Sequence, residues 1–385
     1  MQPSNPSEMK NEATGYTHRQ RVEAALNHKP ADRVPLTMGS PSSSLHRDAH
    51  HNLLKYLGFS QSGPEIITDN ILQIVKTDPR IIETFDIDLV WLLPHLPEVE
   101  WNEDRTELID EFGRTFRAGG GFFNHVGVPF PEASFEALSR YSFPVLPKSL
   151  FAHLGAEAKN FYERGYGIGI DGPWGIYEIS SSLVGLSEYM VTMAIDPELA
   201  IAIAEDVLEK YMIPFYELLL ADTASYVNVV GISDDLGSQT GLLFSPAMYR
   251  KIFKPLHRRL IEFIRSKTDA RIYMHSDGSI YDIIPDLIEI GVDGLNPVQY
   301  TAKGMELERL VREFGKDLGF YGGVVENEIL SFSPPEEITE LARRNVATLK
   351  QEKAFIFAPI HNISQEVPPE NIVALYQAGL AFGKY

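Results

Sequence analysis

Short apolar segments of strand length alternate with longer amphipathic segments through most of the chain. Eight runs have the length of strands, and the last six lack polar alternation, which is typical of parallel strands covered on both faces. They span residues 33–38, 88–93, 167–170, 226–232, 271–274, 294–298, 318–321 and 355–360. The segments between them have helical periodicity, and this alternation predicts parallel strands joined by right-handed crossovers.

Three of the predicted helices have clear start signals, in which a capping side chain precedes a proline at the first helical position. The signals are Asp196-Pro197, Ser245-Pro246 and Ser333-Pro334-Pro335. Eight strand–helix units predict a (β/α)8 TIM barrel, with about 130 residues beyond the usual size of about 250. An open doubly wound sheet is the rival fold. It is disfavoured because residues 39–44 (GSPSSS), after the first strand, lack the GxGxxG spacing.

Two segments fall outside the repeating pattern. Residues 101–117 alternate like paired strands around Asp110-Glu111-Phe112-Gly113, and glycine-rich residues 118–121 follow. We therefore predict a β-hairpin insertion near residues 100–118, over one end of the barrel. The polar residues 1–15 predict a disordered tail. Residues 16–385 are then expected to form a single barrel domain.

Composition narrows the class of function. The chain has 34 basic and 53 acidic residues, a net charge of −19, which disfavours a nucleic-acid-binding protein. It has no cysteine, so any metal must be held by nitrogen and oxygen ligands. No signal-peptide core and no apolar run of about 20 residues is present. We expect a cytoplasmic protein that binds neither nucleic acid nor membrane.

Polar residues follow the predicted strands, and the carboxyl ends of barrel strands meet at the face where function sits. In chain order these residues are His95, Asp171, Asp234, Asp235, His275, Asp277, Asn296, Gln299, His361 and Asn362. Each alone is an ordinary loop residue, but their succession predicts a site. We expect catalytic side chains among Asp234, Asp235 and His95. Those expected to bind a small-molecule substrate are Asp171, Asn296, Gln299 and Tyr177.

A metal site is predicted within this group. His275 and Asp277 are two residues apart on extended backbone, so both side chains point to the same side. With His361 after the last strand, they form a nitrogen and oxygen set that suits zinc or another divalent ion. The alternative is that His275 only caps its strand by bonding Asp277 or a carbonyl. Of the neighbours Asp234 and Asp235, one is expected to face the barrel mouth and the other to cap the following helix.

A basic helical face is a further feature of this acidic chain. It consists of Lys251, Lys254, His257, Arg258 and Arg259. Such a face is ordinarily solvated, and a docking surface is the alternative.

Several segments resemble the uroporphyrinogen decarboxylase superfamily. They are residues 21–35 (RVEAALNHKPADRVP), 234–237 (DDLG), 275–299, 358–362 (APIHN) and 367–371 (VPPEN). The resemblance covers most of residues 18–383 and implies a (β/α)8 barrel, in agreement with the periodicity. The superfamily includes the haem-pathway decarboxylase. It also includes zinc-dependent methyltransferases that move a methyl group between a corrinoid protein and a thiol.

The chain departs from the decarboxylase at two places. That family follows its first strand with Met-Arg-Gln-Ala-Gly-Arg, whose arginines hold the substrate carboxylates. Here the segment is Met38-Gly39-Ser40-Pro41-Ser42-Ser43, and His95 stands where the family has an essential aspartate. The methyltransferase branch is the better resemblance. Its zinc is held by a His-x-Cys pair and a later Cys, which correspond here to His275-Ser276-Asp277 and His361.

The resemblance therefore implies a metal-dependent methyltransferase with a corrinoid, or a corrinoid protein, as methyl carrier. Replacing both cysteines leaves a more Lewis-acidic ion, which suits activation of an oxygen. A metal-free decarboxylase or lyase of the same superfamily is the alternative, and a non-enzymatic binding barrel is the third hypothesis. The sequence is compatible with a homodimer.

Overall fold

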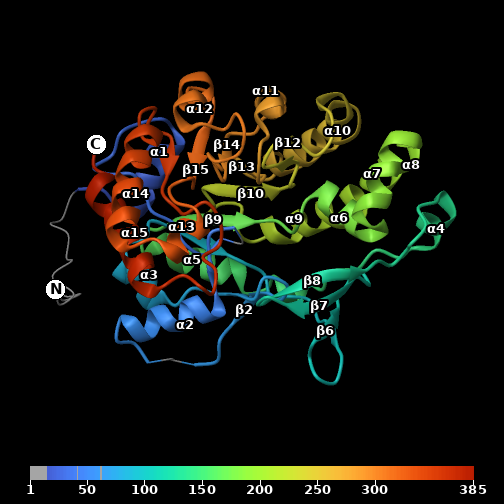
Figure 1. Ribbon diagram of the computed structural model, residues 1–385, viewed down its shortest axis with the longest axis horizontal. Helices are drawn as coiled ribbons and strands as arrows, with labels where there is room; N and C mark the ends of the chain where they lie inside the picture. Colours follow the sequence, from blue (N-terminus) through green and yellow to red (C-terminus); the bar gives the residue numbers. More distant parts are fainter. Residues whose placement is uncertain (1–14, 41, 61–62) are drawn as a thin grey trace.

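A computed structural model describes residues 15–40, 42–60 and 63–385 of the chain. Parallel strands form a ring at the centre of the molecule. Seven of them make one curved sheet in the order β16-β15-β14-β13-β10-β9-β4 (Figure 1). Their bounds are β4 Leu89–Leu92, β9 Gly167–Asp171, β10 Val229–Ser233, β13 Arg271–His275, β14 Gly294–Asn296, β15 Gly319–Tyr321 and β16 Phe355–Ile356.

An eighth segment joins the two edges of this sheet. Leu36 bridges Phe357, next to β16, and Thr37 bridges Leu89 in β4, both in parallel. The predicted (β/α)8 barrel is therefore confirmed, with its first strand reduced to these two bridges. The tail predicted for residues 1–15 lies outside the described residues, apart from Gly15.

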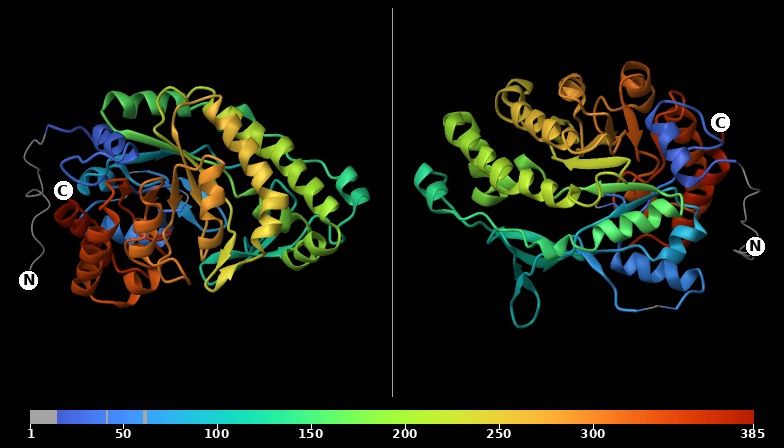
Figure 2. Two further views of the ribbon diagram at one scale, coloured as in Figure 1. Left: turned by 90° about the horizontal axis from the view of Figure 1, so that it is seen from above. Right: turned by 180° about the vertical axis from the view of Figure 1, so that it is seen from behind.

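Helices connect the strands and cover the outside of the barrel (Figures 1 and 2). The longer ones are α1 His18–Leu26, α2 Arg47–Tyr56, α5 Leu154–Glu163, α6 Ile176–Val184, α7 Leu186–Ile195, α8 Pro197–Val207, α9 Ile213–Leu220, α10 Pro246–Arg265, α12 Leu307–Phe314, α14 Pro335–Leu349 and α15 Pro369–Phe382. The short ones are α3 Pro79–Thr84, α4 Phe135–Arg140, α11 Ile284–Glu289 and α13 Asn327–Phe332. No helix in the described part of the chain is long and apolar enough to cross a membrane.

Two of the three predicted helix starts have the predicted cap. Asp196 accepts a hydrogen bond from the Leu199 N–H before α8, and Ser245 accepts one from the Met248 N–H before α10, both at 3.2 Å. The third prediction is wrong in detail, because α14 begins at Pro335 and Pro334 occupies the capping position without a side-chain hydrogen bond.

The barrel interior holds large side chains that face glycines. Tyr273 of β13 is buried, and a Cβ added at Gly294 or Gly319 would lie 2.3 or 2.1 Å from its side-chain atoms. These separations are far inside van der Waals contact, so the tyrosine requires glycine at both positions. Gly231 of β10 leaves room in the same way for the Asp171 carboxylate, 2.3 Å from where its Cβ would be.

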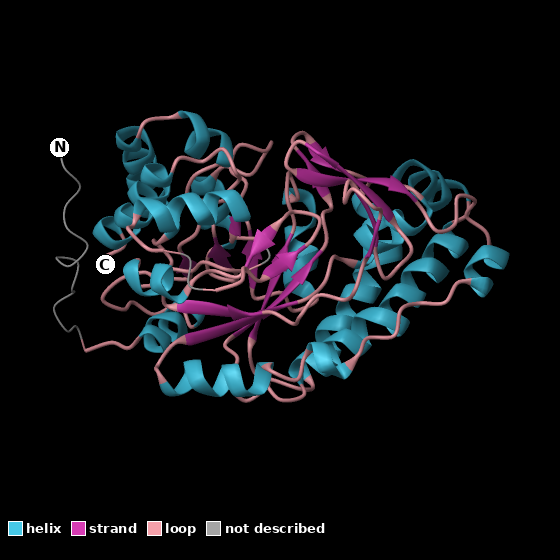
Figure 3. Ribbon diagram, turned by 90° about the horizontal axis from the view of Figure 1, so that it is seen from below, coloured by secondary structure: helices cyan, strands magenta, loops and turns pink. Residues whose placement is uncertain are grey.

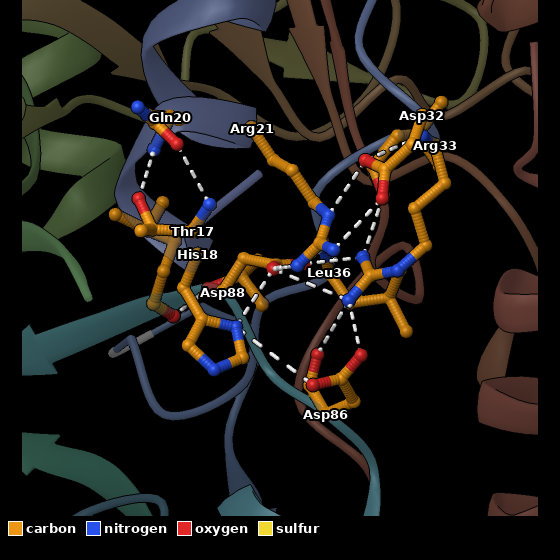
Figure 4. Close-up of polar contacts among 12 residues, drawn as sticks. Thr17, His18, Gln20, Arg21, Asp32, Arg33, Leu36, Asp86 and Asp88 are labelled. Atoms are coloured by element: carbon orange, nitrogen blue, oxygen red, sulfur yellow. Dashed lines mark hydrogen bonds and ion pairs between the residues drawn. The ribbon is translucent and has the colours of Figure 1, made fainter. Parts of the chain in front are cut away.

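An ion-pair cluster lies at the amino-terminal end of the barrel, opposite the end where the carboxyl ends of the strands meet (Figure 4). Asp88, just before β4, is fully buried. It accepts hydrogen bonds from Arg21 of α1 at 3.1 Å, from the Leu36 N–H at 2.8 Å, and from Arg33. Asp32 holds Arg21 from the other side at 2.8 Å. The motif around Arg21 and Arg33, which carries part of the family resemblance, thus fixes α1 and the first barrel segment to β4.

A four-stranded antiparallel sheet is inserted after β4, where a single hairpin near residues 100–118 was predicted. Its strands are β5 Glu100–Trp101, β6 Glu107–Ile109, β7 Thr115–Gly119 and β8 Phe122–Gly127. The prediction stopped too early because Gly120 and Gly121, with φ +67° and +89°, make the turn into β8. Figures 2 and 3 show this sheet standing apart from the central strands.

The remaining strands form two small antiparallel sheets. The first is a three-stranded sheet of β1 Leu45–His46, β2 Ile67–Asp69 and β3 Ile74–Val75, and the second is the hairpin of β11 Gly237–Ser238 and β12 Gly241–Leu242.

Candidate active site

The predicted metal ligands come together at the carboxyl ends of the strands. His275 is the last residue of β13, Asp277 follows it, and His361 lies in the loop after β16. Their ligand atoms all lie within 4.8 Å of one another. Oδ2 of Asp277 is 4.0 Å from Nε2 of His275 and 3.7 Å from Nε2 of His361. All three side chains are partly exposed, so the group is reachable from the barrel mouth.

The donor set fits a divalent cation. Two imidazoles and one carboxylate are a ligand set that catalytic zinc uses, and three protein ligands leave one position for substrate. Ligand atoms around a tetrahedral zinc ion lie about 3.3 Å apart, so small side-chain rotations are sufficient to close this group on an ion. The alternative, in which His275 donates to Asp277, is disfavoured because the two side chains are 4.0 Å apart.

Asn296 determines which nitrogen of His275 faces the group. Its Oδ1 accepts hydrogen bonds from Nδ1 of His275 and from the Ser42 hydroxyl, both at 2.7 Å. Its Nδ2 donates to the Tyr321 carbonyl at 3.2 Å, which fixes the orientation of the amide. Nδ1 of His275 therefore carries a proton, and Nε2 is the nitrogen available to a metal. Asn296 was expected to bind substrate, and its contacts make it a positioning residue instead.

Asp235 lies beside the group. Its Oδ1 accepts a 2.9 Å hydrogen bond from the Asp277 N–H and is 3.7 Å from Nε2 of His275. Burial by itself would lower the pKa of His275, but Asp277 and Asp235 outweigh it and raise that pKa to about 9. Burial lowers the pKa of His361. Because a metal binds neutral imidazole, its binding at Nε2 is coupled to loss of the second proton of His275, the one on Nε2, while Nδ1 keeps its proton.

Asp234 points away from the site, so the expected catalytic role does not suit it. It is fully buried, and its two oxygens accept hydrogen bonds from the backbone N–H groups of Tyr177 at 2.9 Å and Glu178 at 3.0 Å. His257 donates to it at 3.0 Å. One member of the acidic pair thus faces the mouth and the other caps a helix, as expected. The capped helix is α6, however, which precedes the pair in sequence.

Tyr177 and Gln299, which were expected to bind substrate, contact other parts of the protein. Tyr177 is buried in an aromatic cluster with Phe244 and Phe253, and its hydroxyl contacts the Met190 sulfur at 3.6 Å. This packing corrects the expectation, which rested on aromatic composition near a strand end. Gln299 accepts a 2.7 Å hydrogen bond from the Gly278 N–H and so fixes the turn after Asp277.

A cleft with about 1050 Å³ of empty space lies between the barrel mouth and the inserted sheet. Asp171 and His95 line it, as the sequence predicted for site residues, together with Trp174. Burial raises the pKa of Asp171 to about 7, although the nearby His275 acts in the opposite direction. The His95 ring stacks on His153 with centroids 4.0 Å apart. The cleft therefore approaches the metal group from the side of Asp171.

Three acidic residues of this region were missed from the sequence. Asp69 and Glu111 line the cleft from β2 and the inserted sheet. Glu178 lies in the first turn of α6, where it accepts hydrogen bonds from the Gly175 N–H at 2.8 Å and the Ser233 hydroxyl at 3.1 Å. Burial, with Asp235 and Asp234 nearby, raises its pKa to about 8. The signal for Glu178 was a capping-box position after glycine. Asp69 lies at the end of the short strand β2, which was not predicted, and Glu111 was taken only as part of a hairpin turn.

The basic face of α10 is engaged by neighbouring acids. Lys254 bonds Asp286 at 2.7 Å and Glu289 at 2.6 Å, and Arg258 bonds Glu289 at 2.8 Å. His257 is buried. These contacts account for Lys254, His257 and Arg258 by ion pairs with α11 and by burial, and they disfavour a docking surface.

The sequence from Ile170 onward matches a known family. Residues 170–380, more than half of the 385-residue chain, match the uroporphyrinogen decarboxylase (URO-D) family. The chain belongs to the URO-D family. The matched region of this URO-D protein contains all three candidate metal ligands. No curated protein matches its sequence.

A solved methyltransferase structure shows the same fold. A methyltransferase from Methanosarcina mazei is 18% identical with a TM-score of 0.65, over 95% of this URO-D chain and 99% of that chain. Xylanase 10B from Thermotoga petrophila RKU-1 is 11% identical with a TM-score of 0.41, over 96% and 99% of the two chains.

Proposed function

We propose that this URO-D protein is a metal-dependent methyltransferase that moves a methyl group between a small methylated substrate and a corrinoid, free or on a corrinoid protein. The observation that carries the proposal is the His275–Asp277–His361 group, with its ligand atoms within 4.8 Å. These residues stand where the resembling methyltransferase branch holds zinc. The fold shared with the Methanosarcina mazei methyltransferase over 95% of this chain supports the same branch.

Each residue of the site has its own role in this proposal. His275, Asp277 and His361 hold zinc or another divalent ion, which supplies a Lewis acid for an oxygen of the substrate. Asn296 keeps Nε2 of His275 directed at the ion through its 2.7 Å hydrogen bond to Nδ1. Asp235, 3.7 Å from Nε2 of His275, is placed to hold a proton or orient a polar group of the substrate. Asp171 and His95 orient the substrate in the cleft.

A decarboxylase of a polycarboxylate substrate is the alternative, and the charges at the mouth argue against it. Arg114 is the one lysine or arginine that lines the cleft in the described part of the chain, and it already bonds Asp110 at 2.7 Å. Gly39 and Ser43 stand where that family has its substrate-binding arginines, and Ser43 instead bonds the Tyr321 hydroxyl. Carboxylate groups would therefore enter an acidic cleft without a free cation to receive them.

Elemental analysis of purified, tag-free protein tests the proposal, followed by methyl-transfer assays with methylcobalamin and cob(I)alamin. We expect close to one divalent ion per chain, and we expect His275→Ala to lose both the ion and turnover. His51→Ala is the matched control, because His51 is exposed and lies outside the site. Metal-free protein that turns over, or that releases carbon dioxide from an acid, would refute the proposal. The single domain, the homodimer and the cytoplasmic location stay predictions.

A further inference from the structure

The cleft beside the metal group is lined by acidic side chains, most of which are left without a cationic partner among the described residues. Four carboxylates line it, those of Asp69, Asp110, Glu111 and Asp171, against the single guanidinium of Arg114. Arg114 is already engaged, because it donates to Asp110 at 2.7 Å and to the Ser182 hydroxyl at 2.8 Å. In the described part of the chain the other three carboxylates form no ion pair with a lysine or arginine.

Asp171 gives the sharpest sign of a missing cationic ligand. The residue is only 8% exposed, yet one hydrogen bond reaches its carboxylate, from the Gly172 N–H to Oδ1 at 3.0 Å. Nothing in the described residues donates to its Oδ2. Buried carboxylates are normally paired or bonded several times. Burial raises the pKa of Asp171 to about 7, so a cation in the cleft would stabilise the ionised form.

Asp69, which also lines the cleft, likewise has one carboxylate oxygen without a hydrogen-bond donor in the described part of the chain. Its Oδ1 accepts the N–H groups of Ile71 at 2.7 Å and Leu72 at 2.8 Å, while its Oδ2 has no donor among the described residues. Glu111 receives one hydrogen bond, from the Tyr211 hydroxyl at 3.2 Å. Acids from three separate segments of the chain therefore line one space.

Aromatic rings form much of the remaining wall. Trp174, Phe112, Phe151 and Phe215 line the cleft. The Arg114 guanidinium already lies over the Trp174 ring, with its central carbon 5.3 Å from the centroid, so the phenylalanine rings form the rest of the wall. Aromatic faces next to carboxylates are the surroundings in which proteins hold methylated ammonium groups.

We propose that the small molecule bound in this cleft carries a methylated ammonium group, held by Asp171, Asp69 and the aromatic wall of the cleft. The inference rests on the proposed function, because it gives the charge class of the methylated substrate. An amino alcohol meets both parts of the site, with an oxygen for the metal and a cation for the cleft. The net charge of −19 favours the approach of such a molecule over that of an anion.

Calorimetric titration of the full-length protein, freed of metal by a chelator, tests the inference. The probes are choline and 3,3-dimethylbutan-1-ol, which have the same shape and differ by one positive charge. We expect choline to bind at least about tenfold more tightly. Asp171→Asn should weaken choline about tenfold and leave the neutral alcohol unchanged. Asp317→Asn is the matched control, since it removes one negative charge from an exposed residue outside the cleft.

Equal affinity for the two probes, no binding of choline at millimolar concentration, or equal effects of Asp171→Asn and Asp317→Asn would overturn the inference. Near-ultraviolet circular dichroism verifies that each variant is folded, and Glu111→Gln serves as a second test of the cleft. Because the titration uses metal-free protein, its outcome is independent of the metal analysis. Choline binding by a protein that never acquires a metal would refute the methyltransferase proposal and leave the charge preference of the cleft standing.

Discussion

Asn296 accepts a 2.7 Å hydrogen bond from Nδ1 of His275, and the two residues are register partners at the ends of β14 and β13. A side chain on one strand thereby sets the tautomer of a candidate metal ligand on the next. The contact needs no loop, because both residues belong to the paired ends of the sheet. The barrel itself therefore orients the nitrogen that the proposed metal would use.

Asn296→Ala should weaken zinc binding about 10- to 100-fold, as loss of a hydrogen-bond partner to a metal-ligating histidine typically does. Asn296→Asp keeps an acceptor for Nδ1 and should lose less. Competition with a chromophoric chelator measures both affinities. Asn345→Ala is the control, because Asn345 is also buried and bonds the Val324 carbonyl at 2.9 Å. Equal losses of zinc affinity in the Asn296 and Asn345 variants would contradict the positioning role.

The neighbours Asp234 and Asp235 should respond to mutation in opposite ways. Asp234→Ala removes the acceptor of two buried N–H groups and of His257, so we expect unfolding to become about 2–5 kcal/mol easier. Asp235 is 40% exposed, and Asp235→Asn should change stability by less than about 1 kcal/mol. Asp235→Asn should instead lower the turnover number for methyl transfer, by about 100-fold or more.

Urea denaturation and methyl-transfer assays on the two variants separate these roles, with metal content measured in both. If Asp235→Asn destabilises the protein as much as Asp234→Ala and leaves the turnover of the folded fraction intact, the assignment of the two side chains is wrong.

The barrel and the metal group could be predicted from the sequence for a simple physical reason. Buried parallel strands are continuous apolar runs, and the spacing of His275 and Asp277 places them on the same side of extended backbone. Side-chain partners have no such signature. Asp234 and Asp235 are equivalent in sequence, and only the position of the α6 N-terminus decides which one is buried. Likewise, the pattern places Tyr177 near the site but does not show that it packs against Phe244.

The ion-pair cluster at the base of the barrel should be a major source of stability. Asp88→Ala leaves Arg21 and Arg33 buried without their shared carboxylate, which should cost about 3–5 kcal/mol in the free energy of unfolding. Glu107→Gln breaks an exposed pair with Arg117 and should cost less than about 1 kcal/mol. Urea denaturation gives both values. Similar losses in the two variants would show that Asp88 is not the centre of the cluster.

The stability of the metal-free protein should depend on pH through Asp171. The pKa of this carboxyl is raised by burial from 3.8 to about 7 in the folded state. The folded protein thus binds a proton more tightly than the unfolded chain, so its stability is fully present below about pH 4 and falls as pH rises to about 7. Asp171→Asn removes the group that must ionise. We therefore expect the variant to be about 1–3 kcal/mol more stable than the native protein at pH 8, and to have a clearly smaller advantage at pH 5.

Denaturant unfolding in the presence of a chelator, at pH 5 and pH 8, measures the two differences. The chelator is required because a bound cation near Asp171 would lower its pKa and hide the effect. Choline at saturating concentration should reduce the advantage of Asp171→Asn at pH 8, since the proposed ligand stabilises the ionised carboxylate of the native protein. A variant with the same advantage at both pH values would show that the substitution acts through packing, and that Asp171 is already ionised at pH 5.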